Sequence, residues 1–495
     1  MSPSQVIPEE NGALSPIAER VLKVPSLTHE YGKDGIVIAV KAELIVRSSL
    51  FQAQPAFREA LEQIADPVES LVKIQGPIST RVTPGSSSPA QAHHAQPRDY
   101  EPGRGGPNPL LSELQIWRLK DPKTRNSIDE SRRLRTLVPD ERVPTPGGTP
   151  VVAPAVSPNH VAILSPAAGG CPAAPPTPAP PPDGQFVVPP ADGPTARVTV
   201  LDSGYIWIAP PHPPHRNLDN RVTVVRGQTL DPNTGTWVPD EPDGLYTDPA
   251  GQLDGISGHG TFIAGLISHI APRSRLEVVG LRNQEVEIPV LNPGTELGLF
   301  ETEVAIARAM LMRSDTDVIQ CGFAFPTLDD YPSLPFAAVM AELRQGTAPH
   351  GGRVAVVAPA GNEQSPRRYW PAALPDVIGV ASTNRRGNAR AWFSNWGDWC
   401  DCCARGEYVY STFLYWDGPV EGEPITDIEH FRGWARWDGT SFAAPKVSAL
   451  IARLFIAGNR TTPPADIGDA LIAGTAGVPA RTVTDAGVPL RYLQG

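Results

Sequence analysis

From about residue 195 onwards, short apolar runs alternate with longer stretches whose apolar residues recur at helical spacing. The short runs are typical of buried strands and the longer stretches of helices. The predicted elements are, in chain order, Arg197–Leu201, His259–Ile270, Leu276–Leu281, Thr302–Arg313, Val318–Phe323, Phe336–Leu343, Val354–Pro359 and Val377–Ala381. Such alternation predicts an α/β domain over residues 195–495, built on a doubly wound, mostly parallel sheet.

The first 138 residues show a weaker pattern. Apolar residues alternate with others from Ile36 to Val46, which predicts a strand, and Pro55–Ala65 has the spacing of a short helix. Leu110–Asp121 and Asn126–Val138 are two further elements whose type the pattern does not decide. We therefore expect a small α+β N-terminal region.

Two stretches lack such a pattern. Residues 83–109 are rich in Pro, Gly, Ser and Ala, so we expect low complexity there. Proline is dense throughout residues 139–194, which predicts a semi-rigid linker without a core of its own. On this division, a catalytic part that starts near Pro190 would fold alone.

Composition and charge restrict the location and the partners. The net charge of −11 and the pI near 5.5 argue against nucleic acid as a partner. No run of 18 apolar residues is present, so we expect no membrane partner. The first thirty residues carry acidic residues and prolines where a secretory signal has a basic start and an apolar centre. These features predict a cytoplasmic protein.

The five cysteines agree with a reducing compartment, because an odd number leaves at least one unpaired in a monomer. The cluster at Cys400, Cys402 and Cys403 has two interpretations, a zinc knuckle or buried thiols. We favour buried thiols because no second ligand pair at zinc spacing follows, and we expect Cys400 and Cys402 to share one face of a strand. His212 and His215 fit a solvated Pro-rich loop better than a metal site, so no metal ligand is predicted.

Four short polar motifs carry the candidate chemistry. They supply an aspartate, a histidine, an asparagine and a serine, and they are Val198–Gly204, Gly258–Gly265, Val356–Glu363 and Gly439–Pro445. A serine hydroxyl becomes a useful nucleophile when a base takes its proton, and that base needs an orienting carboxylate. The tetrahedral intermediate needs hydrogen-bond donors for its oxyanion. The four residue types together match acyl transfer.

The predicted elements place these residues where that chemistry needs them. Asp202 ends a predicted strand, at the edge where parallel sheets carry their sites. Ser441 begins a helix, so its N–H is available to an oxyanion, with Asn362 as a second donor. Each motif alone is a common structural turn. All four in this order favour a catalytic reading, with Asp202, His259 and Ser441 as the triad.

These motifs closely resemble those of the subtilisin-like serine peptidases, from about Thr195 to Leu454. The resemblance implies a serine endopeptidase that acts on proteins or peptides and requires no cofactor. Calcium sites are frequent in that family, but no acidic loop here assigns one. Arg405 stands where the family usually has proline.

The resemblance also implies substrate-binding positions. One set lies on an extended segment that lines the cleft, and the other set adjoins Asn362; they are Gly322, Phe323, Ala324, Ala360, Gly361 and Glu363. Glu363 matches a position near the floor of the pocket for the residue before the cleaved bond, where it would favour a basic residue. The segment Asp317–Phe325 departs from the family's Asn-x-Ser-x-Gly pattern, which puts the shape of that pocket in question.

Three functional hypotheses remain open. The first and favoured one is an active endopeptidase. The second is a catalytically restrained subtilase fold that serves as a binding module. The third concerns the N-terminal region, which either recruits or regulates through a protein partner, or acts as an inhibitory pro-segment of a zymogen; the long linker favours the recruiting or regulatory role.

Overall fold

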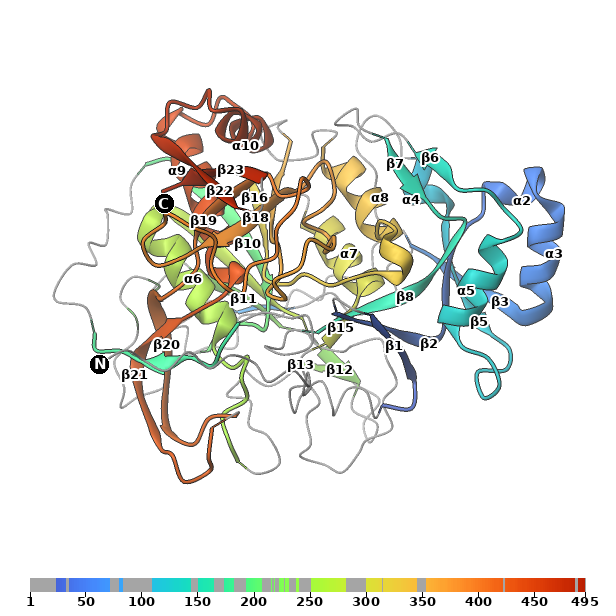
Figure 1. Cartoon of the computed structure of the whole chain (residues 1–495), viewed down its shortest axis with the longest axis horizontal. Coiled ribbons are helices and arrows are strands. Elements are labelled where there is room, and N and C mark those ends of the chain that lie inside the picture. Colours follow the sequence, from blue (N-terminus) through green and yellow to red (C-terminus); the bar gives the residue numbers. More distant parts are fainter. Residues whose placement is uncertain are drawn as a thin grey trace.

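The computed structural model describes most of the chain (Figure 1). The described residues are 24–32, 35–71, 80–82, 109–143, 150–163, 173–181, 193–206, 215, 218, 222–226, 228–230, 237–239, 251–281, 300–313, 315–344, 353–421, 423–485 and 488–494. His212, Cys171, nearly all of residues 83–109 and most of residues 238–254 lie outside them.

The larger sheet has the strand order β22-β23-β19-β18-β17-β16-β10-β14-β11-β4. Its strands are β4 (Thr80–Val82), β10 (Ala196–Asp202), β11 (Val222–Arg226), β14 (Ser274–Gly280), β16 (Val318–Cys321), β17 (Ala355–Pro359), β18 (Ile378–Thr383), β19 (Cys402–Arg405), β22 (Ala480–Asp485) and β23 (Val488–Leu493). From β11 to β23 every neighbouring pair is parallel, and only the edge strands β4 and β22 are antiparallel. The predicted mostly parallel sheet is therefore present.

Helices cover both faces of this sheet and form two cores. The helices are α6 (His259–Ile270), α9 (Ala444–Ala457) and α10 (Pro464–Ala473) on one face, and α7 (Glu303–Leu311) and α8 (Leu334–Leu343) on the other. Successive strand residues face opposite sides, so Val200 of β10 packs in the first core and Leu201 in the second. Burial on both faces explains why these strands are continuously apolar in the sequence.

The second large unit is a sheet of the order β15-β8-β2-β5-β3, with β1 paired to β2. Its elements are β1 (Leu27–Gly32), β2 (Gly35–Arg47), α2 (Leu50–Ala53), α3 (Pro55–Ile64), β3 (Ala65–Ser70), α4 (Pro109–Glu113), β5 (Leu114–Leu119), α5 (Ser127–Arg135), β8 (Val156–Ile163) and β15 (Phe300–Thr302). The core sequence β2-α3-β3-β5-α5-β8 and its antiparallel pairing follow the ferredoxin-like β-α-β-β-α-β arrangement. The predicted strand at Ile36–Val46 and helix at Pro55–Ala65 are confirmed.

The predicted linker at 139–194 is wrong in its first half. Strand β8 lies between β2 and β15, so residues 156–163 belong to the centre of the N-terminal sheet. The strand was not predicted because the high proline content of residues 139–194 was interpreted as a linker. Pro158 pairs with Leu44 next to a break in the β2–β8 register, where a residue without an N–H is tolerated. Because β15 comes from the catalytic part, the premise that this part folds alone from Pro190 also needs correction.

A smaller three-stranded sheet lies beside α6. It consists of the hairpin β20 (Val409–Gly418) and β21 (Glu429–Trp437), with β9 (Thr177–Pro178) paired to β21. The remaining pairs are β6 (Glu141–Val143) with β7 (Val151–Ala153) and β12 (Gln228–Leu230) with β13 (Trp237–Pro239). Two short 3₁₀ turns, η1 (Leu328–Asp330) and η2 (Thr440–Phe442), complete the described elements.

Among the described residues, one helical segment is long and apolar enough to match a membrane span by length and composition. The 18-residue window Thr440–Ala457 has a mean hydropathy of 1.3, and 78% of it is buried inside the protein. This segment includes α9, which packs against the central strands of the large sheet. Its burial identifies it as a core helix.

Candidate active site

Asp202 and His259 form a buried pair at the carboxyl edge of the large sheet. Asp202 is the last residue of β10, where the chain order reverses between β14 and β16. His259 Nδ1 lies 2.8 and 2.9 Å from the two carboxylate oxygens of Asp202. Both side chains are fully buried. A carboxylate can only accept here, so Nδ1 carries the proton and Nε2 has a lone pair.

Glycines allow these two residues to approach. A Cβ on Gly322 would lie 1.6 Å from Asp202 Oδ2, and one on Gly260 would lie 2.1 Å from the Gly204 carbonyl oxygen. Gly258, just before α6, has φ +78° and faces the Phe413 ring. Gly322, predicted to bind substrate, also makes room for the Asp202 carboxylate, a role that could not be predicted from local sequence.

Ser441 lies in η2, at the entry to α9. Gly439 N–H donates to Gly406 O at 3.0 Å and fixes the preceding turn. Within α9, Ser448 Oγ donates to Gln320 Oε1 of β16 at 2.6 Å, which anchors the helix to the sheet. This buried contact could not be predicted from the sequence, since Gln320 and Ser448 are far apart along the chain.

His259 contacts Phe442, the residue that follows Ser441 in the chain. The His259 ring lies 5.2 Å from the Phe442 ring, centroid to centroid. Among the described residues, neither Ser441 Oγ nor His259 Nε2 has a hydrogen-bond partner, although both atoms are buried. The buried, unpartnered atoms are those that a proton transfer between serine and histidine would use.

Asn362 is oriented by the residue before the serine. Its Oδ1 accepts from Thr440 N at 2.9 Å and from Thr440 Oγ1 at 3.0 Å. A backbone N–H must face the oxygen of an amide, so this contact fixes which way the side chain points. The Gly361 N–H also donates to Thr440 Oγ1 at 3.1 Å. Thr440 therefore fixes which end of the Asn362 amide carries the oxygen and which end carries the Nδ2 donor.

Glu363 is tied into the same loop. Its Oε2 accepts from Asn362 N and from Asn395 Nδ2, each at 3.0 Å. Burial raises the pKa of Glu363 to about 7, partly offset by these hydrogen bonds. The carboxylate therefore holds the Asn362 loop, a role the sequence did not suggest; selection of a basic substrate residue by Glu363 stays a prediction.

The other predicted substrate-binding residues have buried side chains. Phe323 stacks on Phe336 at 6.0 Å, and Ala324 and Ala360 join the same core. Only backbone groups of these residues are available to an extended substrate, and their role stays a prediction. The Gly322 N–H is already engaged with Leu201 O at 2.9 Å.

Aromatic side chains from the β20–β21 hairpin cover the histidine. The Trp437 ring meets the His259 ring edge-on at 5.5 Å and the Phe262 ring at 5.6 Å. His215, expected in a solvated loop, is buried under this hairpin with Nε2 2.8 Å from Phe413 O. Burial lowers the pKa of His215, which favours its neutral form.

The described cysteines are buried and unpaired. Cys400 precedes β19 and packs with Cys403 in one core, whereas Cys402 packs in the other. The expectation that Cys400 and Cys402 share a face is therefore wrong, because Cys400 lies outside the strand. Within the described part of the chain, no three His, Cys, Asp or Glu side chains gather as metal ligands would.

A family model described as the subtilase family (Peptidase S8) matches residues 193–492, more than half of the chain. A curated relative, the extracellular basic protease of Dichelobacter nodosus, is 25% identical over 259 residues; the match covers 49% of this chain and 39% of the relative. The chain thus spans well under half the length of that relative. The cytoplasmic location predicted from the sequence is not supported, because this relative is extracellular.

Two solved structures are also similar. A cold-adapted subtilisin-like serine proteinase matches with 19% identity over 60% of this chain and 88% of its own, at a TM-score of 0.40. Fervidolysin from Fervidobacterium pennivorans, described as a keratinolytic enzyme related to subtilisin, matches with 15% identity over 95% of this chain and 63% of its own, at 0.47. With TM-scores below 0.5, these likenesses add nothing to the assignment.

Proposed function

The chain belongs to the subtilase family, and on this premise we propose that it is a serine endopeptidase in which Ser441 is the nucleophile. His259 is the general base and Asp202 orients it. The observation that carries the proposal is the His259 ring, whose Nδ1 is held by buried Asp202 while Nε2 has no partner among the described residues.

The proton path follows from this arrangement. Ser441 Oγ attacks the peptide carbonyl and gives its proton to His259 Nε2, and Asp202 stabilises the imidazolium that forms. His259 then protonates the leaving amine. In the second half of the reaction His259 takes a proton from a water molecule, which attacks the acyl-enzyme. Ser441 and His259 are not hydrogen-bonded here; such contacts commonly tighten only when substrate binds.

Two donors would stabilise the oxyanion. Asn362 Nδ2 is one, because Oδ1 of the same amide is fixed on Thr440. The Ser441 N–H at the entry to α9 is the other, where the helix dipole favours negative charge. Proteins or peptides are the substrates we propose, bound through the backbone of Gly322, Phe323 and Ala324. No resident cofactor is needed for these steps.

A fluorophosphonate probe tests the nucleophile, because such a probe forms a bond only with an activated serine. We expect labelling at Ser441, identified by peptide mass, and loss of both labelling and hydrolysis in Ser441→Ala. Ser448→Ala is the matched control, since it removes another buried serine hydroxyl, in the helix α9 that follows Ser441, and should still label. Peptidase activity that survives in Ser441→Ala would refute the assignment.

We further propose that the chain before the catalytic part restrains the site through residues 173–181, as an inhibitory pro-segment would. Residues 173–181 lie along β21 towards Ser441. The Ala173 N–H donates to Asp438 O at 2.9 Å, Trp437 Nε1 donates to Ala174 O at 2.5 Å, and the Ala179 N–H donates to Trp434 O at 3.2 Å. Asp438 is three residues before Ser441. Together with the burial of the triad, this favours restraint over recruitment.

Weakening this strand should raise activity if the segment inhibits. Ala179→Pro removes the N–H that bonds to Trp434 O, in a proline-rich context that accepts the new residue. We expect faster hydrolysis by intact Ala179→Pro than by the parent chain. Pro178→Ala is the control, because it removes none of the three hydrogen bonds. Equal rates in all three chains would contradict inhibition, and absent labelling even after release of the segment would favour the binding-module hypothesis.

A further inference from the structure

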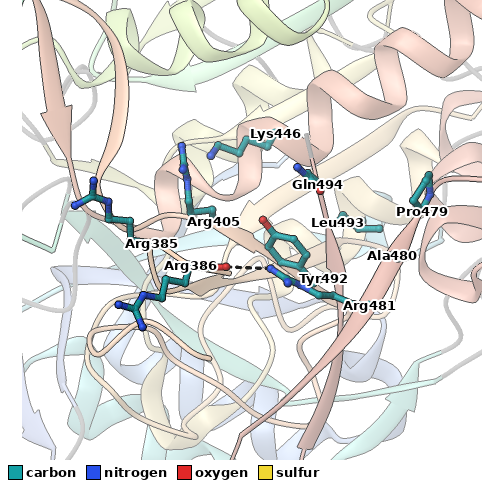
Figure 2. Close-up of a pocket in the computed structure, with 10 residues that line it drawn as sticks. All are labelled: Arg385, Arg386, Arg405, Lys446, Pro479, Ala480, Arg481, Tyr492, Leu493 and Gln494. Carbon is teal, nitrogen blue, oxygen red and sulfur yellow. Dashed lines mark hydrogen bonds between the residues drawn. The ribbon is translucent and has the colours of Figure 1, made fainter. Parts of the chain in front are cut away.

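Cations make up half of the residues that line a cavity of about 560 Å³ beside the start of α9 (Figure 2). Its charged and aromatic lining residues are Arg385, Arg386, Arg405, Lys446, Arg481 and Tyr492. They come from the turn after β18, from the end of β19, from the first turn of α9 and from β22 and β23. No Asp or Glu side chain is among the described residues that line it. This concentration of positive charge occurs in a chain whose net charge is −11.

Two of these cations face each other without a counter-charge. In Figure 2 the end of the Lys446 side chain lies beside the Arg405 guanidinium. In the part of the chain that the structure describes, neither side chain makes an ion pair or side-chain hydrogen bond. Lys446 is only 9% exposed. Burial first, and then the charge of Arg405, lowers the pKa of Lys446 to about 7.

Two of the other cations, Arg481 and Arg385, are oriented by contacts of their own. Arg481 donates to the Arg386 carbonyl oxygen at 3.1 Å, the dashed line in Figure 2, and lies over the Tyr492 ring at 4.6 Å. Arg385 lies over the Tyr408 ring at 4.2 Å. These contacts hold guanidinium groups at the rim without neutralising them. A solvated basic surface would not explain a buried, unpaired lysine, because such a charge is costly to bury without a partner.

We propose that this cavity is a binding site for a polyvalent oxyanion of the polyphosphate class. Guanidinium groups bind phosphate oxygens in pairs, and several cations around one cavity match a ligand with several negative charges. A bound anion would supply the negative counter-charge that Arg405 and Lys446 lack. The inference is independent of the proposed peptidase activity. It also gives a role to Arg405, which stands where the family resemblance expects proline.

The site is connected to the nucleophile turn. Arg405 is followed by Gly406, whose carbonyl oxygen accepts from the Gly439 N–H at 3.0 Å, two residues before Ser441. Lys446 lies in the first turn of α9, just after Ser441, and its N–H donates to Ala443 O at 3.2 Å. A ligand that bridges Arg405 and Lys446 would therefore join β19 to the start of α9, and its binding should raise the melting temperature.

Calorimetric titration of the full chain with inorganic tripolyphosphate tests the proposal, in a Ser441→Ala background to prevent self-digestion. We expect saturable binding of one ligand per chain, a higher Tm, and affinity at least tenfold lower in Arg405→Gln and in Lys446→Met. Arg58→Gln is the charge-matched control, because Arg58 is exposed and its partner is Glu62 of the same helix; it should bind like the parent. Sodium chloride at equal ionic strength should not raise the Tm.

Proton uptake gives a second readout that a general salt effect would not produce. At pH 8 the unliganded Lys446 is mostly neutral, so anion binding should draw a proton onto it, measured from the heat in buffers of different ionisation enthalpy. The charged and titratable groups around Lys446 are Arg405, Arg385, Arg386, Arg481 and Tyr492. Uptake should vanish in Lys446→Met. Unchanged affinity in Arg405→Gln, binding that does not saturate, or tighter binding of citrate than of tripolyphosphate would overturn the proposal.

Discussion

In the described part of the chain, two buried histidine–carboxylate pairs lie in different regions, and they differ in the hydrogen bonding of one atom, the histidine Nε2. In the candidate active site, His259 Nδ1 faces Asp202 at 2.8 and 2.9 Å. Between the N-terminal sheet and the catalytic part, His160 Nδ1 faces Glu303 Oε1 at 2.6 Å. Both pairs are almost completely buried. His160 Nε2, however, accepts the Leu328 N–H at 2.9 Å, whereas His259 Nε2 has no partner among the described residues.

The difference separates a structural pair from a chemical one. The Leu328 N–H uses the lone pair of His160 Nε2, so this ring cannot take another proton without losing that bond. The His160 N–H also donates to Glu303 Oε1 at 2.9 Å, and Ser333 Oγ donates to Oε2. His160 lies in β8 and Glu303 begins α7, so the pair joins the two large units. In the other pair the lone pair stays available, as a base requires.

The largest expected effect is on the chemical pair. Asp202→Asn should lower kcat by ~10⁴, the size known for the equivalent change in a chymotrypsin-type triad, because the amide favours the wrong tautomer of His259. Peptide hydrolysis and thermal unfolding are measured together. Glu303→Gln is the matched control in the structural pair and should retain kcat. If both variants lose activity equally, the distinction between the two pairs is wrong.

The proposed oxyanion donor Asn362 should have the next largest effect. Asn362→Asp keeps an oxygen for Thr440 but removes the Nδ2 donor, so kcat should fall by at least ~10²–10³, a size known from subtilisin, itself a member of this family. Stopped-time assays would give kcat and KM separately, with Tm as a check on the loop. A change in KM alone would mean that Asn362 shapes the pocket and does not stabilise the oxyanion.

Removing the carboxylate of the structural pair should affect stability. Glu303→Ala leaves the His160 ring and backbone N–H and the Ser333 hydroxyl without their acceptor, so the free energy of unfolding should fall by ~3–5 kcal/mol. Denaturant unfolding in the Ser441→Ala background measures this. Asp315→Ala is the control: it breaks the exposed pair with Arg197, in which the side chains are about half exposed, and should cost ~0–1 kcal/mol. Equal losses in the two variants would show that the buried His160–Glu303 pair contributes no more to the free energy of unfolding than an exposed ion pair.

The smallest effect concerns Glu363, a carboxylate without a histidine. Its pKa rises from 4.5 to about 7 on folding, so between these pH values the folded chain holds a proton that the unfolded chain has lost. This group therefore lowers stability as pH rises from 4.5 to 7 and adds no further change above pH 7. The fall in Tm over that interval should be smaller in Glu363→Gln than in the parent. Parallel Tm curves would contradict the raised pKa.

Much of the catalytic part could be predicted because its information is local. Helix α6 begins at His259 and ends at Ile270, as the apolar spacing predicted, and β10 ends at Asp202. Strand β8 could not be found in the same way. Its residues include Pro158 and the polar Ser157, Asn159 and His160, which are buried only because β2 and β15 flank them. A local pattern carries no information on such distant neighbours.

The sequence by itself was enough to propose the catalytic residues, because Asp202, His259, Asn362 and Ser441 each occur in a motif whose glycines and strand or helix ends are set by near neighbours. Only the tertiary structure decided their surroundings: the contact of Gly322 with Asp202, the loop hydrogen bonds of Glu363, and the position of residues 173–181 along β21. It alone also distinguished His160 from His259, and gathered Arg405 and Lys446 at one cavity. The physical reason is that burial and hydrogen-bond satisfaction depend on residues that only folding brings together.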